Sequence, residues 1–148
     1  MTEQMEVPKT LTDYLQRRPE IIAAYLFGSV AAGKAHKFSD VDVALLLADT
    51  VDAKQAWDIR LEAMGEAEAA FGRQADVAIL NTSPIVFCYL TLKHGKLIFD
   101  RGLSQRPEFE ASIYIAYFDL KPYLEEYDRA LFKRIKEHGL GYGYPKAA

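Results

Sequence analysis

The sequence predicts an α/β domain built on a small mixed β-sheet, and two observations carry this prediction. Four short apolar runs have the length and composition of buried strands: 21–27, 41–47, 75–80 and 97–99. Longer segments at 53–71 and 104–138 place apolar residues three or four positions apart, as helices with one packed face do. Because helical and extended segments alternate along most of the chain, the helices are expected to cover the sheet.

The first half of the chain predicts a helix, two strands and a second helix. Either Thr10 or Thr12 is expected to cap the first helix, which should end before Pro19. The second helix, 53–71, places its larger apolar side chains on one face and ends at Gly72, where a C-cap belongs. That face consists of Trp57, Leu61, Met64 and Phe71.

The second half predicts two further strands, 75–80 and 97–99, each followed by a helix. Ser83 is the expected N-cap of the next helix, with Pro84 at its first position and an end near His94. The last helical element begins near Ser104, and Pro122 should kink or break it. The order of helices and strands gives a mixed sheet with helices packed against it.

Length and composition restrict the class of protein. The 148 residues, half of them hydrophobic, suit one domain with a core at about 20–100 and a C-terminal helical part at about 104–138. Eighteen Lys and Arg against 21 Asp and Glu argue against an obligate nucleic-acid-binding protein. The lone Cys88 cannot form an internal disulfide, and neither a secretory signal nor a membrane span is present. We therefore expect a cytoplasmic protein that binds neither nucleic acid nor membrane.

Three aspartates are the candidate metal ligands. Asp40 and Asp42 are two positions apart at the start of a strand, so their side chains point to the same face of the sheet. Two carboxylates in an otherwise apolar strand repel each other and lose hydration, and Mg²⁺ would compensate for both costs. If the strand that begins near Asp76 lies beside this one, the third carboxylate joins them, and three carboxylates can hold two metal ions.

Gly28 and Ser29 are the candidate phosphate-binding residues. They end the first strand, and ten residues separate Ser29 from Asp40. Glycine lets the backbone approach a ligand closely, and the N–H groups of such a turn bind phosphate. The phosphate-binding and metal-binding parts of a nucleoside-triphosphate site are therefore both present in the sequence.

This spacing resembles a known family. Gly28-Ser29, ten intervening residues and then Asp40-Val41-Asp42 are similar to the motif of the polymerase-β-like nucleotidyltransferases, and Asp76 matches their third carboxylate. The run KLIFDRG at 96–102 and the helix after it resemble, within that superfamily, the MntA-type antitoxins, which are partners of HEPN-domain toxin ribonucleases.

The resemblance implies a set of site residues. Asp40, Asp42 and Asp76 would hold two Mg²⁺ ions and serve catalysis, with ATP as the substrate. The residues implied in nucleotide binding are Gly28, Ser29, Gly33, Lys37 and Ser39. The sequence departs from the family at Ala32, where many relatives carry a basic residue. Either Lys34 or Lys37 would then take over the contact with the triphosphate, or phosphate binding would be weaker than in the family.

The resemblance also implies the acceptor. The expected reaction is transfer of AMP to a tyrosine hydroxyl of a HEPN toxin, which would neutralise the toxin. Two alternatives stay open from the sequence. One is a nucleotidyltransferase for small molecules such as aminoglycosides, and the other is an antitoxin that acts by binding alone.

Overall fold

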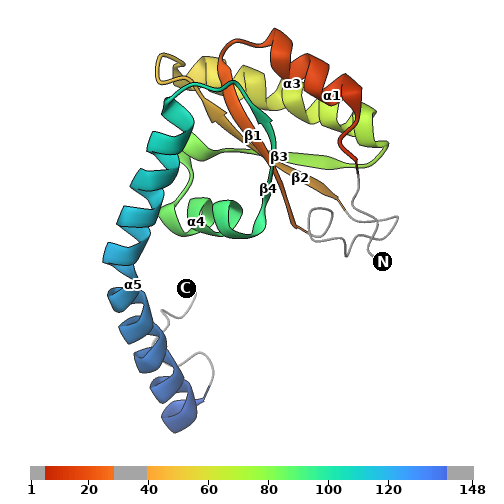
Figure 1. Cartoon of the computed structure of the whole chain (residues 1–148). Coiled ribbons are helices and arrows are strands. Elements are labelled where there is room, and N and C mark those ends of the chain that lie inside the picture. The colour runs from red at the N-terminus through yellow and green to blue at the C-terminus, as the bar shows by residue number, and fades with distance from the viewer. Residues whose placement is uncertain (1–5, 29–39, 140–148) are drawn as a thin grey trace.

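The structure is a computed structural model that describes residues 6–28 and 40–139. Within them the chain folds in the predicted order, with one added 3-10 turn (Figure 1). The elements are α1 (Lys9–Arg17), β1 (Ile21–Phe27), β2 (Val41–Leu47), α3 (Ala53–Phe71), β3 (Ala75–Ile79), η1 (Leu80–Thr82), α4 (Ile85–His94), β4 (Lys96–Asp100) and α5 (Gln105–His138). The third strand is one residue shorter than predicted, because Leu80 begins the 3-10 turn.

The predicted mixed sheet is confirmed. Its strand order is β3-β2-β1-β4, with β1 antiparallel to both of its neighbours and β2 parallel to β3. A parallel pair needs a long crossover, and α3 provides it between β2 and β3. This crossover places β3 at one edge of the sheet, next to the strand that carries Asp42.

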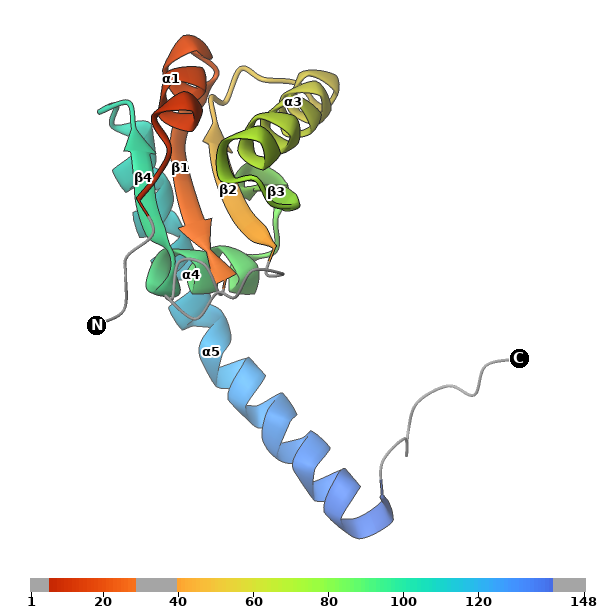
Figure 2. The same ribbon diagram turned by 90° about the vertical axis from the view of Figure 1, so that its right-hand side faces the viewer.

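Helices cover both faces of the sheet, as Figures 1 and 2 show. The helices α1 and α3 bury one face, where Leu15 and Ile59 pack against alternate residues of β2 such as Val43. The helices α4 and α5 cover the other face, where Cys88 and Ile113 join a second apolar cluster. The two central strands, β1 and β2, are almost entirely buried because they lie between two helical layers, whereas the edge strand β4 is exposed or half-buried along its length.

The prediction for the packed face of α3 is right for two of its four residues. Met64 and Phe71 are partly buried against the core, whereas Trp57 and Leu61 are 55% and 49% exposed. The fully buried residues of the helix are Ile59, Ala63 and Ala67, which the prediction did not include. Both ends follow simple capping rules, with a reciprocal capping box at the start and the predicted left-handed Gly72 at the end.

Two predicted N-caps are wrong. The first helix begins after Pro8 with no side-chain cap, and the hydroxyl of Thr12 donates instead to the carbonyl of Lys9. The helix α4 begins one residue later than predicted, with Pro84 at the N-cap position. Ser83 donates to the carbonyl of Ile79 at 2.7 Å, so its hydroxyl joins the helix to the end of β3.

The long helix α5 is anchored near its start. The Tyr25 hydroxyl on β1 donates to the Glu110 carboxylate at 2.6 Å, and Arg106 bridges Glu110 and Asp100. Burial and this acidic partner raise the pKa of the Tyr25 phenol well above its usual value. One buried residue, Ile113, fixes the helix against the sheet.

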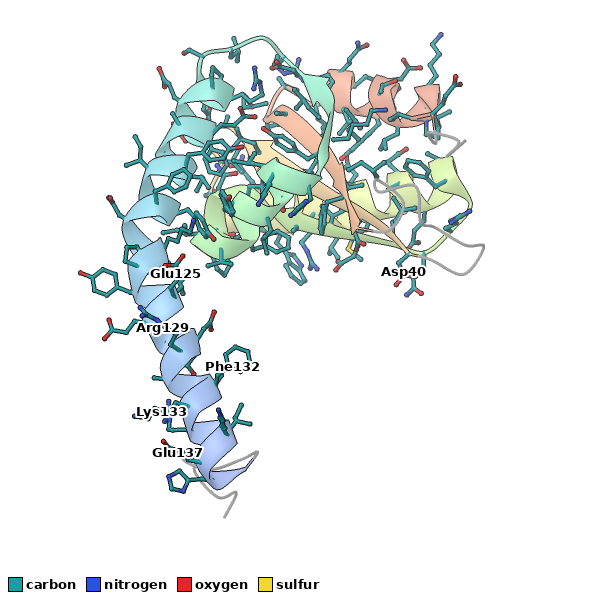
Figure 3. All side chains as sticks on the ribbon, turned by 60° about the horizontal axis from the view of Figure 1, so that its bottom comes forward. Asp40, Glu125, Arg129, Phe132, Lys133 and Glu137 are labelled. Carbon is teal, nitrogen blue, oxygen red and sulfur yellow. The ribbon has the colours of Figure 1, made fainter. Side chains whose placement is uncertain are left out.

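Beyond this anchored part, α5 leaves the domain. Pro122 does not break the helix, although Figure 1 shows a change of direction near its middle. The labelled side chains of Arg129, Phe132 and Lys133 project from a segment that no other described element covers (Figure 3). Among the described residues, no helix combines the length and the apolar character that crossing a membrane requires.

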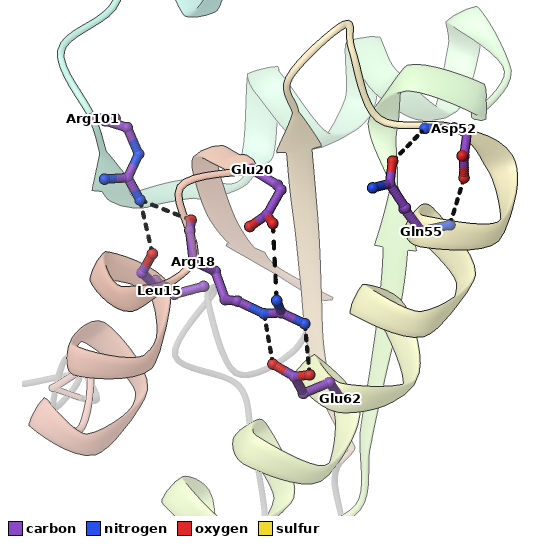
Figure 4. Close-up of polar contacts among 7 residues, drawn as sticks. All are labelled: Leu15, Arg18, Glu20, Asp52, Gln55, Glu62 and Arg101. Carbon is purple, nitrogen blue, oxygen red and sulfur yellow. Dashed lines mark hydrogen bonds and ion pairs between the residues drawn. The ribbon is translucent and has the colours of Figure 1, made fainter.

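Polar contacts fix the opposite side of the molecule. Arg101 donates to the carbonyls of Leu15 and Arg18 at the end of α1, at 3.0 and 2.9 Å (Figure 4). The Arg18 guanidinium also forms two hydrogen bonds with the Glu62 carboxylate of α3, at 2.8 and 2.7 Å. These contacts join α1 to β4 and α3.

Candidate nucleotidyltransferase site

Two of the predicted aspartates lie side by side across the sheet. Asp42 is the second residue of β2 and Asp76 the second residue of β3, and they are direct partners in the parallel ladder. On the other side of Asp42, the ladder partner is Phe27 of β1. The prediction that the third strand lies beside the second is therefore confirmed, and it places both carboxylates at one end of the sheet.

Gly28 faces Asp42 at close range. Its φ of +79° lies in the left-handed region that favours glycine. A Cβ atom at this position would collide with Oδ2 of Asp42 and lie 3.3 Å from its Cγ. Glycine is thus required here twice, by the backbone conformation and by the carboxylate beside it.

The electrostatic environment of Asp42 is unfavourable for a charged carboxylate. Partial burial, followed by the negative charges of Asp76 and Asp40, raises the pKa of Asp42. Asp42 is therefore close enough to both other predicted carboxylates to be affected by their charges. A cation between them would reverse this effect, because it favours the ionised forms of all three.

Asp76 is held by an arginine of α3. The Arg60 guanidinium lies 3.3 Å from Oδ1 of Asp76, and its Nε donates to the carbonyl of Val77 at 2.6 Å. The same guanidinium lies 5.4 Å from the centre of the Trp57 ring. The Arg60 guanidinium therefore lies between the Trp57 ring and the Asp76 carboxylate.

Asp40 is exposed just before β2. Figure 3 places it at the end of the domain, far from the labelled residues of α5. Within residues 6–28 and 40–139, no three acidic, His or Cys side chains form a ready cluster for one metal ion. The donor chemistry nevertheless fits Mg²⁺, which takes one or two carboxylates together with substrate phosphates.

Several predicted site residues lie outside the described part of the chain: Ser29, Gly33, Lys37 and Ser39. Conversely, no pattern in the sequence singles out Arg60, which pairs with Asp76, or Trp57, whose ring lies beside Arg60. Their spacing of three residues places them on neighbouring positions of a helix. Only the folded chain brings that part of α3 to the edge of β3.

These features define the class of protein. The chain belongs to the polymerase beta nucleotidyltransferase family, whose model matches residues 9–102. This range holds the whole sheet, with Gly28 and all three predicted carboxylates.

One known protein is similar to the chain in sequence. The chain is 31% identical over 93 residues to the protein adenylyltransferase MntA of Shewanella oneidensis, a match that covers 63% of this chain and 63% of that protein. The match thus spans less than two thirds of the relative's length.

Solved structures of toxin–antitoxin complexes have a similar fold. One, with AMP-PNP, gives a TM-score of 0.61 at 23% identity and covers 85% of this chain and 96% of that chain. Another contains a tri-AMPylated HEPN toxin of Shewanella oneidensis with an MNT antitoxin, with a TM-score of 0.53 at 22% identity, and covers 84% and 92%. These likenesses extend the shared fold beyond residue 102, because they cover more of the chain than the family model does.

Proposed function

We propose that this chain is an antitoxin that transfers AMP from ATP to a tyrosine hydroxyl of a HEPN-domain toxin ribonuclease. One observation carries the proposal: Asp42 and Asp76 are ladder partners beside Gly28, and the pKa of Asp42 is raised by burial and by both neighbouring carboxylates. Such an arrangement is costly to the fold, which is typical of a site that serves a reaction.

The family and the site support AMP transfer. The acceptor oxygen forms a bond to the α-phosphorus of ATP, the bond from that phosphorus to the oxygen bridging it to the β-phosphate breaks, and pyrophosphate leaves. In this proposal Asp76 orients the acceptor hydroxyl and receives its proton, which then passes to solvent. Gly28 leaves room for the phosphates of the leaving group, together with Ser29.

Asp40, Asp42 and Asp76 are the proposed Mg²⁺ ligands. Two bound ions would neutralise charge on the phosphates and lower the pKa of the attacking hydroxyl. Removal of the metal is therefore expected to weaken ATP binding, since the three carboxylates repel the triphosphate when no cation lies between them. Calorimetry of ATP binding in Mg²⁺ and in EDTA measures this difference, and equal binding in both would contradict it.

The proposed acceptor and partner rest on similarity to known proteins. A protein adenylyltransferase is the curated relative, and one similar structure holds an AMPylated HEPN toxin with an MNT antitoxin. A toxin of this kind acts on RNA in the cell, so the proposal includes a cytoplasmic location. The lone, buried Cys88 suits a reducing compartment.

The test is the intact mass of a HEPN toxin incubated with ATP, Mg²⁺ and this chain. The wild type should add AMP-sized increments to tyrosine, and the double variant Asp40→Asn/Asp42→Asn should add none. The double variant should still bind the toxin, because an Asp-to-Asn change leaves the surface shape unaltered. Full protection of cells by the double variant, with an unmodified toxin, would favour an antitoxin that acts by binding alone.

A further inference from the structure

The order of the site residues across the sheet indicates from which side the acceptor approaches. Gly28 follows β1, Asp42 lies on β2 and Asp76 lies on β3 at the edge. In an in-line displacement, the attacking and leaving oxygens lie on opposite sides of the phosphorus. With the leaving phosphates on the Gly28 side, the acceptor hydroxyl has to arrive over Asp76, from the β3 edge.

A groove of about 430 Å³ lies along this edge. One wall is formed by α3 through Ala53, Trp57 and Arg60, and the floor is formed by β3. Asp76 is part of its lining, so the groove is continuous with the row of carboxylates. A molecule bound in the groove would therefore reach the carboxylate that is proposed to receive the acceptor's proton.

The edge of β3 is poorly suited to pairing with another strand, because most of its outward backbone groups are already bonded. N–H and C=O groups of alternate residues point to opposite sides of a parallel strand. The N–H of Val41 donates to the carbonyl of Gln74, so the backbone groups of residues 75, 77 and 79 point outward, and four of these six groups have a partner. The N–H of Ala75 donates to the Glu68 carboxylate at 3.4 Å, and the N–H of Val77 donates to the Asp76 carboxylate at 2.9 Å. The carbonyl of Val77 accepts from Arg60 at 2.6 Å, and the carbonyl of Ile79 accepts from Ser83 at 2.7 Å. We therefore expect an occupant of the groove to insert a side chain rather than to add a strand.

The groove is suited to an aromatic side chain. Trp57 is 55% exposed on its wall, although indole is among the side chains that gain most from burial. The Arg60 guanidinium joins the Trp57 ring, at 5.4 Å, to the Asp76 carboxylate, at 3.3 Å. A phenol that packs against Trp57 and Arg60 with its ring would place its hydroxyl at Asp76.

We propose that this groove is the acceptor site, that it receives a tyrosine side chain of the protein substrate, and that Trp57 binds the ring of that tyrosine. The inference rests on the proposed AMP transfer to a protein tyrosine. It adds the route by which the acceptor enters the site. It also assigns recognition of the acceptor to α3, whereas the nucleotide is assigned to Gly28 and the aspartates.

The experiment measures AMP transfer to a purified HEPN toxin as the toxin concentration is varied at saturating ATP. Trp57→Ala should raise the KM for the toxin by about tenfold, since exposed aromatic anchors dominate such contacts, with kcat and the Kd for ATP unchanged. Trp57→Phe should restore most of the loss. Ala53→Phe, which fills the groove without removing a contact, should raise the same KM. Leu61→Ala is the matched control, because Leu61 is 49% exposed on the same helix but does not line the groove.

Three outcomes would contradict a proposal, and they separate this inference from the function on which it rests. If the wild type modifies the toxin normally and Trp57→Ala leaves the KM for the toxin unchanged, the groove is not the acceptor site. If Trp57→Ala raised the Kd for ATP as much as the KM for the toxin, the assignment would also be wrong, because Trp57 would then bind the nucleotide. If the wild type adds no AMP to the toxin, the proposed function itself is wrong, and the acceptor site with it.

Discussion

The two ends of the β1–β2 ladder are built in opposite ways. At the Ile21–Leu47 end, which we call the bonded end, polar side chains satisfy the backbone. Arg101 donates to the Ile21 carbonyl at 2.9 Å, and Asn81 both donates to and accepts from the backbone of Leu47 at 2.8 Å. At the Phe27–Asp42 end, which we call the acidic end, Gly28 crowds Asp42, and the pKa of Asp42 is raised.

This difference shows how one small sheet separates stability from function. The bonded end uses a neutral amide and a cation that bond to the backbone, and both contacts stabilise the folded chain. The acidic end keeps charged groups that disfavour folding and that a ligand would compensate. Substitutions at the two ends should therefore have opposite consequences.

The largest expected effect is at the acidic end. Asp42→Asn should lower the rate of AMP transfer by about 10²–10³-fold or more, because it removes a charge that binds the proposed metal ions. The same change should not destabilise the chain, and it should raise Tm by a few degrees, since it relieves repulsion and desolvation. Rates from toxin modification and Tm from calorimetry test both parts, with Asp119→Asn on the exposed side of α5 as the control.

The pH dependence of stability sharpens this prediction. The folded state holds the proton of Asp42 more tightly than the unfolded chain does. Stability contributed by this group is therefore present at low pH and is lost as pH rises from its ordinary pKa of about 4 through its raised folded value. Asp42→Asn should remove this part of the pH profile. A wild-type excess in stability over the variant near neutral pH would contradict the assignment.

The next effect is at the bonded end. Arg101→Met should lower the free energy of unfolding by about 2–4 kcal/mol, because the carbonyls of Ile21, Leu15 and Arg18 all lose their charged donor. The Kd of the folded protein for ATP should stay unchanged. Urea denaturation and calorimetry measure the two quantities. Arg129→Met, an exposed arginine of distal α5, should change stability by less than about 0.5 kcal/mol.

A smaller effect is expected from Gly28→Ala. The left-handed backbone costs an alanine about 1–2 kcal/mol, and the collision with Asp42 adds to this. Gly72→Ala is the matched control, because Gly72 has a φ of +66° but no atom near its missing Cβ. Asp42→Ala should remove the added part, so a double-mutant cycle isolates it. Equal costs at Gly28 and Gly72 would show that the carboxylate does not crowd the turn.

The smallest effect is expected away from both ends. Phe132 is 70% exposed on the segment of α5 that leaves the domain. Phe132→Ser should alter the free energy of unfolding by less than about 0.5 kcal/mol, despite the loss of a large apolar side chain. A loss of more than 1 kcal/mol in urea denaturation would mean that distal α5 packs against the domain in solution.

The comparison also shows what the sequence alone could predict. The strands of the core were predictable because each is a short apolar run, and the Gly28-Ser29 and Asp40-Val41-Asp42 spacing identified the family before any fold was known. The buried face of α3 was predictable only in part, since large residues usually mark the inner face of a helix and small alanines do not. Met64 and Phe71 do pack against the core, but Trp57 is exposed, and Ala63 and Ala67 are buried instead.

Contacts between distant elements were also beyond prediction. The Arg60–Asp76 ion pair depends on where the crossover helix ends relative to β3, and the Arg101 contacts join β4 to the end of α1. No spacing in the sequence encodes such distances. The N-cap predicted at Ser83 was wrong for a local reason, because the 3-10 turn at Leu80–Thr82 brings the carbonyl of Ile79 within 2.7 Å of the Ser83 hydroxyl.

The burial of Cys88 has a practical consequence for labelling. It is the single cysteine of the chain, its thiol donates to the carbonyl of Leu80 at 3.4 Å, and burial raises its pKa. A thiol of this kind reacts slowly with maleimides. The wild-type chain is therefore ready for the attachment of one fluorophore at a cysteine introduced on its surface. A dye at position 61, one turn along α3 from Trp57, would report toxin binding by fluorescence without removal of the native cysteine.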